Sequence, residues 1–147
     1  RGDTVHPSTM DIMGQLGLLE RFLARPHQRL TRAELRIGGR ELVVGDLSRV
    51  RSRTPFVAMM PQWEFLDFLR QEGSSLLDFR LDMAAPVSGY LEEDGRVTGV
   101  QLSSGEQVRA PLVIAADGRH SLVRQHDLLP LKDLGSPIDV FWFELPK

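Results

Sequence analysis

The sequence predicts a mixed α/β fold, and three patterns support this assignment. Two stretches, residues 8–23 and 61–73, carry apolar side chains at helical spacing. Several other stretches alternate apolar and polar residues between glycine-containing turns, as half-buried strands do. Residues 112–115 are apolar throughout, which is typical of a strand buried on both faces. We therefore expect helices and strands that pack in layers around one core.

The first helix is expected to begin at Ser8, with Asp11 three residues later as in a capping box. Gly17 interrupts the helical pattern at a cost of about 1 kcal/mol relative to Ala, so we expect a bend or a close packing contact there. The predicted apolar stripe of this helix consists of Ile12, Met13, Leu16, Leu19, Phe22 and Leu23.

A β-hairpin is predicted over residues 31–47. Polar and apolar residues alternate on both sides of Gly38 and Gly39, and such a glycine pair is typical of a tight turn. Residues 56–60 are the next strand candidate, because they form a short apolar run. The hairpin and this strand together predict a β-rich segment between the two helices.

Three arginines, Arg49, Arg51 and Arg53, alternate between the hairpin and the next strand. If this segment is extended, its period of two places all three cations on one face. Two interpretations remain open. The segment is either a solvated loop or a landing site for an anionic substrate or the phosphates of NAD(P)H.

The second helix is expected over residues 61–73, and short strands follow it. The inward-facing residues of this helix are expected to be Trp63, Phe65, Leu66 and Leu69. Further strands are predicted at residues 79–84, 87–91, 97–102, 107–110 and 140–145, and residues 128–137 have the composition of a loop. Asp94-Gly95 and Ser104-Gly105 are turn signals, so the strands at 87–110 are expected to form an antiparallel meander.

The most informative stretch begins with the apolar run at residues 112–116 and ends in a short helix that reaches about residue 126. The run stops at Asp117-Gly118, where the glycine can adopt φ > 0 at no steric cost. Ser121 and Arg124 lie in the predicted helix. A carboxylate is thus expected at the C-terminal tip of a buried strand, and open α/β sheets bind ligands at that edge.

Composition excludes several classes of function. The 147 residues suit about one domain, and the 18 basic and 20 acidic residues give a net charge of −2, without the basic footprint of a nucleic-acid partner. There is no transmembrane run, no signal peptide, no cysteine and no metal-binding or hydrolytic constellation. We expect a soluble, cytoplasmic protein. Because the chain starts with Arg and ends directly after an apolar run, we also expect it to be part of a longer protein.

The pattern ADG-x-x-S-x-VR at residues 116–124 resembles the second flavin motif of the FAD-dependent aromatic hydroxylases, the para-hydroxybenzoate hydroxylase type of class A flavoprotein monooxygenase. The resemblance implies that Asp117 and Gly118 lie beside the FAD ribose and pyrophosphate, near the path of the nicotinamide cofactor. Ser121 and Arg124 complete the motif. The alternative is an Asp-Gly turn with a capped helix, which many α/β proteins contain.

Two further residues carry the resemblance. Arg1 is followed sixteen residues later by Gly17 of a Leu-Gly-Leu element. The same spacing is found in these hydroxylases where the chain leaves the loop after the second strand and enters a helix. The resemblance implies that Arg1 approaches the FAD pyrophosphate, and a guanidinium suits paired phosphate oxygens. It also implies that Gln62 lies beside the flavin and its ribitol chain. The alternatives are a solvated terminal arginine and a capping or solvent-facing glutamine.

The resemblance also implies a domain plan. It predicts part of a glutathione-reductase-type FAD-binding, Rossmann-like domain with a β-meander, together with part of a substrate-binding sheet. The helical part of the FAD-binding domain would span residues 1–29, and the substrate-binding sheet would begin at 30–60. The FAD-binding domain would continue over 61–127 with the meander and the Asp-Gly motif, and residues 128–147 would return to the substrate-binding sheet.

The implied activity is that of a monooxygenase. NAD(P)H reduces FAD, the reduced flavin binds oxygen at its C4a carbon, and one oxygen atom passes to a small, often aromatic substrate. A reductase, dehydrogenase or halogenase of the same fold is an alternative, as is a non-enzymatic α/β binding module. The chain lacks a G-x-G-x-x-G fingerprint and the family's third motif, so we expect the isolated chain to bind FAD weakly or not at all.

Overall fold

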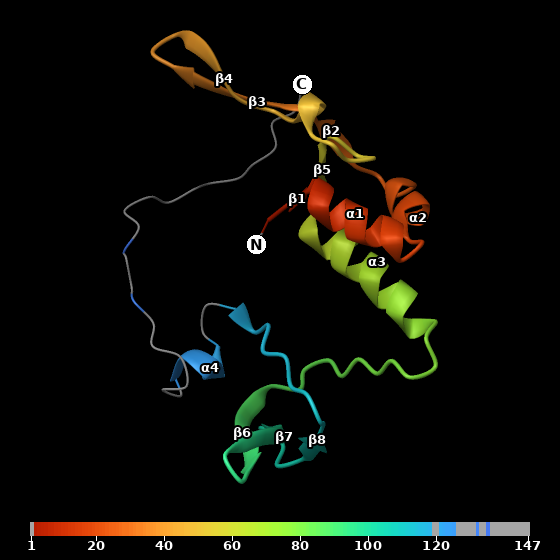
Figure 1. Ribbon diagram of the computed structural model, residues 1–147, viewed down its shortest axis with the longest axis vertical. Coiled ribbons are helices and arrows are strands. Elements are labelled where there is room, and N and C mark those ends of the chain that lie inside the picture. Colours follow the sequence, from red (N-terminus) through yellow and green to blue (C-terminus); the bar gives the residue numbers. More distant parts are fainter. Residues whose placement is uncertain (1, 119–120, 126–131, 133–134, 136–147) are drawn as a thin grey trace. The chain divides into compact units, whose positions relative to one another are not determined.

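The computed structural model describes residues 2–118, 121–125, 132 and 135 (Figure 1). Arg1, the predicted strand at 140–145 and most of the predicted loop at 128–137 therefore lie outside the described residues. The chain divides into two compact units, Arg1–Leu81 and Asp82–Lys147. The first unit contains a three-stranded sheet and a two-stranded ribbon, the second contains a three-stranded sheet, and each unit is described by itself.

The first unit contains a small antiparallel sheet in the order β1-β5-β2. Its strands are β1 (Thr4–Val5), β2 (Gln28–Leu30) and β5 (Val57–Met59). The central strand is β5, which pairs with β1 through Val5↔Ala58 and with β2 through Arg29↔Ala58. Ala58 is fully buried at this point, so the strand predicted at residues 56–60 is confirmed.

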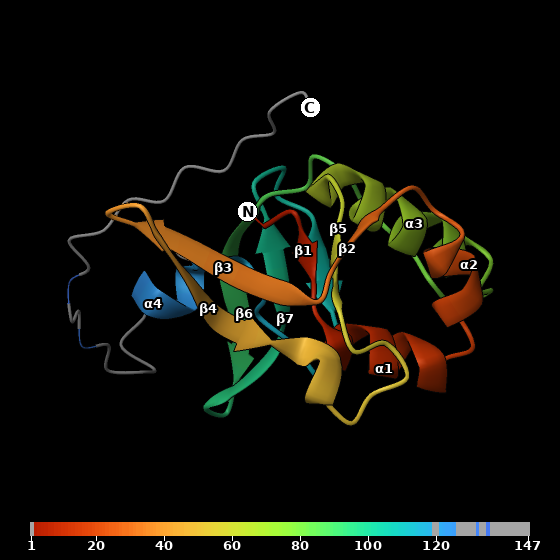
Figure 2. The ribbon, with the colours of Figure 1, turned by 90° about the horizontal axis from the view of Figure 1, so that it is seen from above.

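Three helices pack on this sheet, and together they form the core of the first unit (Figures 1 and 2). They are α1 (Pro7–Gln15), α2 (Leu19–Leu23) and α3 (Gln62–Ser74). Phe22 of α2 is fully buried and meets Phe68 of α3 edge-on, with ring centroids 5.6 Å apart. The buried core residues are Val5, Met10, Met13, Phe22, Phe56, Ala58, Met60 and Phe68.

The start of α1 differs from the prediction at Ser8. The helix begins at Pro7 and its N-cap is His6, which makes no side-chain capping hydrogen bond. Proline suits the first helical position because its φ angle is already helical and its missing N–H would have no partner there. Ser8 is therefore inside the helix, and the predicted capping box with Asp11 is wrong.

The single apolar stripe predicted across residues 8–23 is confirmed only in part: Met13 and Phe22 lie in the core, and Leu19 and Leu23 pack against it. Gly17 has φ +71°, a left-handed conformation, and separates α1 from α2. The predicted bend is thus confirmed as a helix end. Since the two helices have different axes, the period does not continue across the glycine, and Ile12 and Leu16 remain 55% and 66% exposed.

The inward face of α3 is centred on Phe68, which is 1% exposed. The sequence favoured Trp63, Leu66 and Leu69, but these are 65%, 55% and 37% exposed, so that part of the prediction is wrong. Only Phe65 of the predicted set packs on the core. Residues 65 and 68 form one helical stripe and residues 66 and 69 the neighbouring one; the phenylalanine stripe turns inward because it meets Phe22.

The predicted hairpin is confirmed as a two-stranded ribbon of β3 (Arg32–Ile37) and β4 (Arg40–Asp46). Gly38 and Gly39 have φ +56° and +77°, as the tight turn requires. Both views show the ribbon projecting away from the three helices (Figures 1 and 2). A short 3-10 helix, η1 (Leu47–Arg49), follows it directly.

The sheet of the second unit is the predicted antiparallel meander in the order β6-β7-β8. Its strands are β6 (Val87–Glu93), β7 (Arg96–Leu102) and β8 (Gln107–Arg109). Asp94 and Gly95 join β6 to β7 with φ angles of +50° and +73°. The short helix α4 (Leu122–Gln125) lies within the predicted helical segment.

Two predicted strands do not form. Residues 79–84 have no strand structure. The apolar run at 112–116 also has no strand structure, and Leu112 and Ile114 are 72% and 78% exposed. The prediction of a strand buried on both faces is therefore wrong. An inner strand needs a hydrogen-bonded neighbour on each side and a covering layer on each face, and no described strand pairs with residues 112–116.

Within the described residues, every helix is too short or too polar to cross a lipid bilayer.

Candidate functional site

The Asp117 turn is the best-defined polar site of the second unit. Oδ2 of Asp117 accepts a hydrogen bond from the N–H of Leu122, 3.0 Å away, at the start of α4. The Ser121 hydroxyl hydrogen-bonds the same carboxylate, and this contact, followed by the Leu122 N–H, lowers the pKa of Asp117 below its ordinary value of 3.8. Ser121 itself is buried. The carboxylate is therefore ionised near neutral pH and fixed in direction.

Gly118 gives this turn its shape. Its φ of +80° lies in the left-handed region, and a Cβ placed there would meet no atom within 4 Å. The position therefore requires glycine for its backbone angle, because open space surrounds it. Its carbonyl accepts the N–H of Ser121 at 3.2 Å. A fixed carboxylate thus stands next to backbone that another molecule can approach.

Tyr90 of β6 links the meander electrostatically to this turn. Burial raises the pKa of Tyr90, and the negative charge of Asp117 raises it further. The half-buried phenol and the carboxylate are thus within electrostatic reach of each other inside the second unit. The sequence pattern gave no signal for this pairing, because Tyr90 lies in an ordinary alternating strand.

Gln62 lies in the first unit, exposed at the first position of α3. Its N–H donates a hydrogen bond to Oδ1 of Asp3 across 3.2 Å. The N–H of Met60 donates to the backbone carbonyl of the same Asp3 at 2.9 Å. Sequence reasoning missed Asp3. A signal for it exists, since Pro61 precedes the helix without a capping side chain, but that signal does not say which residue supplies the cap.

The six residues that the resemblance assigns to cofactor binding thus fall in different places. Asp117, Gly118 and Ser121 form one turn, and the backbone N–H of Arg124 donates to the Ser121 carbonyl at 3.0 Å, which brings the exposed Arg124 into the same turn. Gln62 belongs to the first unit, and Arg1 lies outside the described residues.

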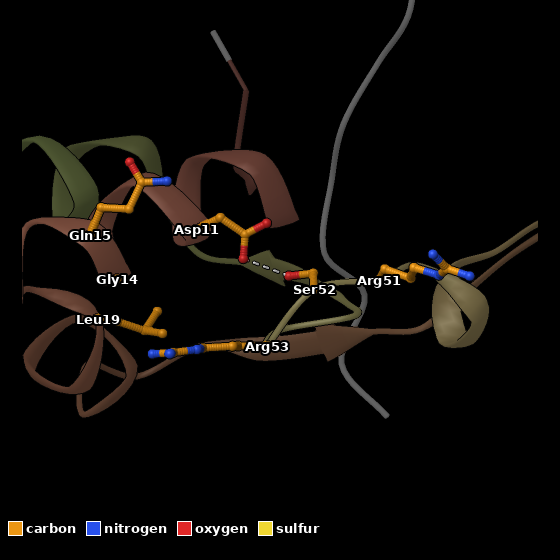
Figure 3. Close-up of a pocket in the computed structure, with 7 residues that line it drawn as sticks. All are labelled: Asp11, Gly14, Gln15, Leu19, Arg51, Ser52 and Arg53. Atoms are coloured by element: carbon orange, nitrogen blue, oxygen red, sulfur yellow. Dashed lines mark hydrogen bonds between the residues drawn. The ribbon is translucent and has the colours of Figure 1, made fainter.

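A hollow of about 560 Å³ lies between α1 and the loop that follows η1 (Figure 3). The Ser52 hydroxyl donates to Oδ1 of Asp11 across 2.8 Å at its rim. Figure 3 shows the Arg53 side chain extending toward Leu19, whereas Arg51 points the opposite way. The hollow is lined by Asp11, Gly14, Gln15, Leu19, Arg51, Ser52 and Arg53.

The three alternating arginines therefore do not share a face. Arg49 ends η1 and the residues after it form bends, so the segment is not extended as the one-face arrangement requires. Asp11 also brings a negative charge to the hollow that Arg53 enters. The condition for three cations on one face is not met, and the solvated-loop interpretation describes this segment better.

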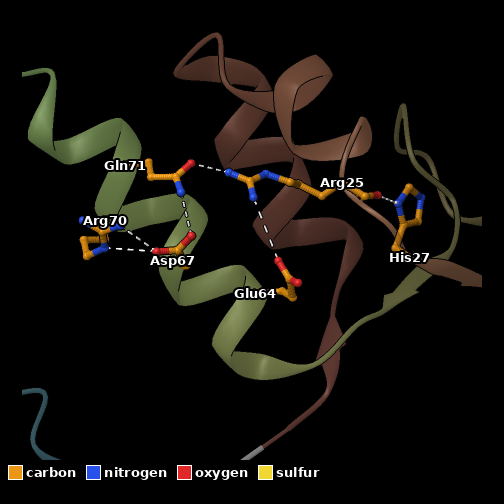
Figure 4. Close-up of polar contacts among 6 residues, drawn as sticks. All are labelled: Arg25, His27, Glu64, Asp67, Arg70 and Gln71. Carbon is orange, nitrogen blue, oxygen red and sulfur yellow. Dashed lines mark hydrogen bonds and ion pairs between the residues drawn. The ribbon is translucent and has the colours of Figure 1, made fainter.

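A polar network ties α3 to the segment after α2 (Figure 4). Arg25 donates to the Gln71 side chain and lies 3.9 Å from a carboxylate oxygen of Glu64. Asp67 accepts from Arg70 at 2.8 Å and from the Gln71 amide at 2.6 Å. Through Glu64 and Gln71, which lie seven residues apart on α3, Arg25 links this helix to the segment after α2.

Comparisons with known proteins agree with the resemblance. The profile of a family described as "FAD binding domain" matches residues 1–138. The 6-methylpretetramide 4-monooxygenase of Streptomyces rimosus is 31% identical over 153 aligned residues, covering 99% of this chain and 36% of that protein. The rifampicin monooxygenase of Streptomyces venezuelae is 31% identical over 127, covering 85% of this chain and 25% of that protein.

The fold has a counterpart among solved structures. A crystal structure of a PqsL variant from Pseudomonas aeruginosa matches 93% of this chain with a TM-score of 0.77 at 19% sequence identity. The chain covers 38% of that structure. This likeness shows the fold, and the chain spans between a quarter and two fifths of the lengths of these three proteins.

The family match covers most of the chain, and the two relatives are named as monooxygenases. The chain belongs to the FAD-binding domain family of the class A flavin monooxygenases.

The chemistry of the Asp117 turn fits a nucleotide cofactor. A carboxylate that stays ionised accepts hydrogen bonds from ribose hydroxyls, and an open glycine lets a ligand approach the backbone. The carboxylate alone would repel a pyrophosphate, so a neighbouring cation is needed to offset it. Arg124 is exposed in the same turn and carries a positive charge.

Proposed function

We propose that this chain supplies part of the FAD site of an NAD(P)H-dependent monooxygenase that hydroxylates a small, aromatic substrate. The observation that carries the proposal is the family match over residues 1–138 together with the fixed, ionised Asp117 beside the open Gly118. Two relatives are named as monooxygenases, one of 6-methylpretetramide and one of rifampicin, and these names support the proposed class of reaction. When bound, FAD supplies the redox chemistry that activates oxygen.

Asp117 has an orienting role in this proposal. Its lowered pKa makes it a poor proton donor near neutral pH, so it accepts hydrogen bonds from ribose hydroxyls and takes no part in proton transfer. Ser121 holds the carboxylate, Gly118 leaves room for the cofactor, and Arg124 offsets the charge of the pyrophosphate. The resemblance also assigns Arg1 to the FAD phosphates and Gln62 to the flavin, and the proposal keeps both assignments.

The test uses the natural full-length protein and compares Asp117→Ala with Glu92→Ala, an exposed acidic residue of the same unit. We expect Asp117→Ala to weaken FAD binding about tenfold, because hydrogen bonds to a charged group are lost. Glu92→Ala should retain wild-type affinity. Equal affinity in both variants would refute the role of Asp117.

Activity is tested separately by following NAD(P)H oxidation with and without oxygen and by searching for a hydroxylated aromatic product. Oxygen-dependent consumption with product formation supports a monooxygenase. Oxidation that proceeds equally without oxygen, through another acceptor, would contradict it.

A further inference from the structure

Asp3 makes two contacts that join segments far apart in the sequence. Its backbone carbonyl accepts the N–H of Met60 at 2.9 Å, and its side-chain Oδ1 accepts the N–H of Gln62 at 3.2 Å. The neighbouring pairs Thr4↔Met59 and Val5↔Ala58 continue the same antiparallel register. Asp3 is therefore the point where the edge strand β1 meets the start of α3.

The start of α3 needs such a partner. The first N–H groups of any helix have no acceptor inside the helix. Pro61 occupies the N-cap, and its own side chain makes no capping hydrogen bond because it has no oxygen. Asp3, 59 residues earlier in the chain, supplies the missing acceptor. A carboxylate at this end also interacts favourably with the helix dipole.

The hydrogen bond between Asp3 and Gln62 joins two segments that the proposed function assigns to the cofactor site. Asp3 follows Arg1 by two residues, and its partner Gln62 begins α3. Both Arg1 and Gln62 are assigned to the cofactor in the proposed function, on which this inference rests. Fixing Asp3 to Gln62 limits how far these two segments can move relative to each other.

We propose that Asp3 is a positioning residue of the FAD site, which holds the start of α3 against the segment that follows Arg1. It acts through the Gln62 backbone and not by touching the cofactor. A second carboxylate in direct contact with a pyrophosphate would repel it, whereas a carboxylate that accepts an N–H at a helix start is stabilised there. This positioning role requires a side-chain oxygen that reaches the Gln62 N–H, and it depends less on the negative charge of Asp3.

Two substitutions of Asp3 separate the loss of the hydrogen-bond acceptor from the loss of the negative charge. Asp3→Ala removes the acceptor, whereas Asp3→Asn retains a side-chain oxygen and removes the charge, and asparagine caps helices about as well as aspartate. Asp46→Ala is the matched control. Asp46 is also an aspartate that caps a helix, since its carboxylate accepts the Ser48 N–H at 3.0 Å at the start of η1.

Three quantities are measured in the natural full-length protein: the Kd for FAD, the hydrogen-exchange rate of the Gln62 amide, and the quenching of Trp63 fluorescence by bound flavin in a Trp142→Phe background. Trp63 directly follows Gln62 and is exposed, so it reports on this end of α3. We expect Asp3→Ala to raise the Kd about fivefold, the size of a typical lost cap, and to speed exchange at Gln62. Trp63 quenching at saturating FAD should also change.

Asp3→Asn should stay within about twofold of the wild-type Kd. Asp46→Ala should leave both the Kd and Gln62 exchange unchanged. An unchanged Kd in Asp3→Ala would overturn the inference, and so would tighter FAD binding in both Asp3 variants, which would show that the carboxylate acts as a repelling charge. A wild-type protein that binds no FAD would instead refute the proposed function.

Discussion

Replacement of Gly99 by alanine tests the packing of the meander. Gly99 is buried in β7, where it pairs with Leu91 on one side and Arg109 on the other. A Cβ at this position would lie 2.3 Å from the carbonyl oxygen of Val108 and 3.0 Å from a methyl carbon of Leu91. The first neighbour is backbone, so it cannot move away by rotating a side chain.

The cost follows from that distance. Carbon and oxygen atoms in sheets approach to about 3.3 Å, so β8 would have to move by about 1 Å. Overpacking of this kind costs about 1–3 kcal/mol, and weakened hydrogen bonds between β7 and β8 add to it. We therefore expect Gly99→Ala to lower the free energy of unfolding by about 3 kcal/mol.

Gly89→Ala is the matched control, because Gly89 lies in the neighbouring strand β6 and a Cβ added there would meet no atom within 4 Å. It should leave stability unchanged or raise it by up to about 1 kcal/mol. Urea denaturation followed by circular dichroism gives both values. Hydrogen exchange at the Ala110 amide, which donates to Thr98 across 3.0 Å, should accelerate only in Gly99→Ala. Equal stability of the two variants would refute the packing argument.

Three further predictions concern the two units separately. Because the folded-state pKa of Asp117 is lowered, its stabilising hydrogen bonds should persist as the pH falls to the ordinary pKa of 3.8 and should be lost as the pH falls through the lowered value. An NMR titration of the α4 amides measures this loss, and Ser121→Ala should move it to higher pH. Phe68→Ala should destabilise the first unit by about 3–5 kcal/mol in urea, whereas Trp63→Ala on the same helix should cost no more than about 0.5 kcal/mol; similar losses would contradict the core assignment. Gly118→Ala should cost about 1 kcal/mol through its positive φ alone, and an unchanged denaturation midpoint would argue against that backbone geometry.

Local chemistry explains which elements the sequence predicted well. The Gly38-Gly39 and Asp94-Gly95 turns require positive φ angles that few residues adopt, so their hairpins follow from a few neighbouring residues. The end of α1 at Gly17 has the same origin. In each case the signal and the structure lie within a few residues of each other.

The predictions failed where the structure of a segment depends on residues that are distant in the sequence. Residues 112–116 are apolar enough for an inner strand, but a strand forms only beside other strands, and none of the described strands lies beside them. The inward face of α3 depends on Phe22, which selects Phe68 over Leu69. The cap that Asp3 provides was not predicted because its partner is 59 residues away.

The candidate site shows the same division. The Asp117-Gly118 turn and the short helix after it were expected from the short motif at residues 116–124, whereas the hydrogen bond from the Leu122 N–H to Asp117 matches the alternative of an Asp-Gly turn with a capped helix. The electrostatic link between Tyr90 and Asp117 depends on how the meander folds back toward the motif, which no short pattern encodes.

The most direct test of the central claim is the flavin content of the natural full-length protein after purification, measured by absorbance and by mass spectrometry of the released cofactor. We expect stoichiometric FAD in the wild-type protein, and a lower flavin content in Asp117→Ala at equal folded yield. A folded wild-type protein that is colourless and does not take up added FAD would contradict the claim.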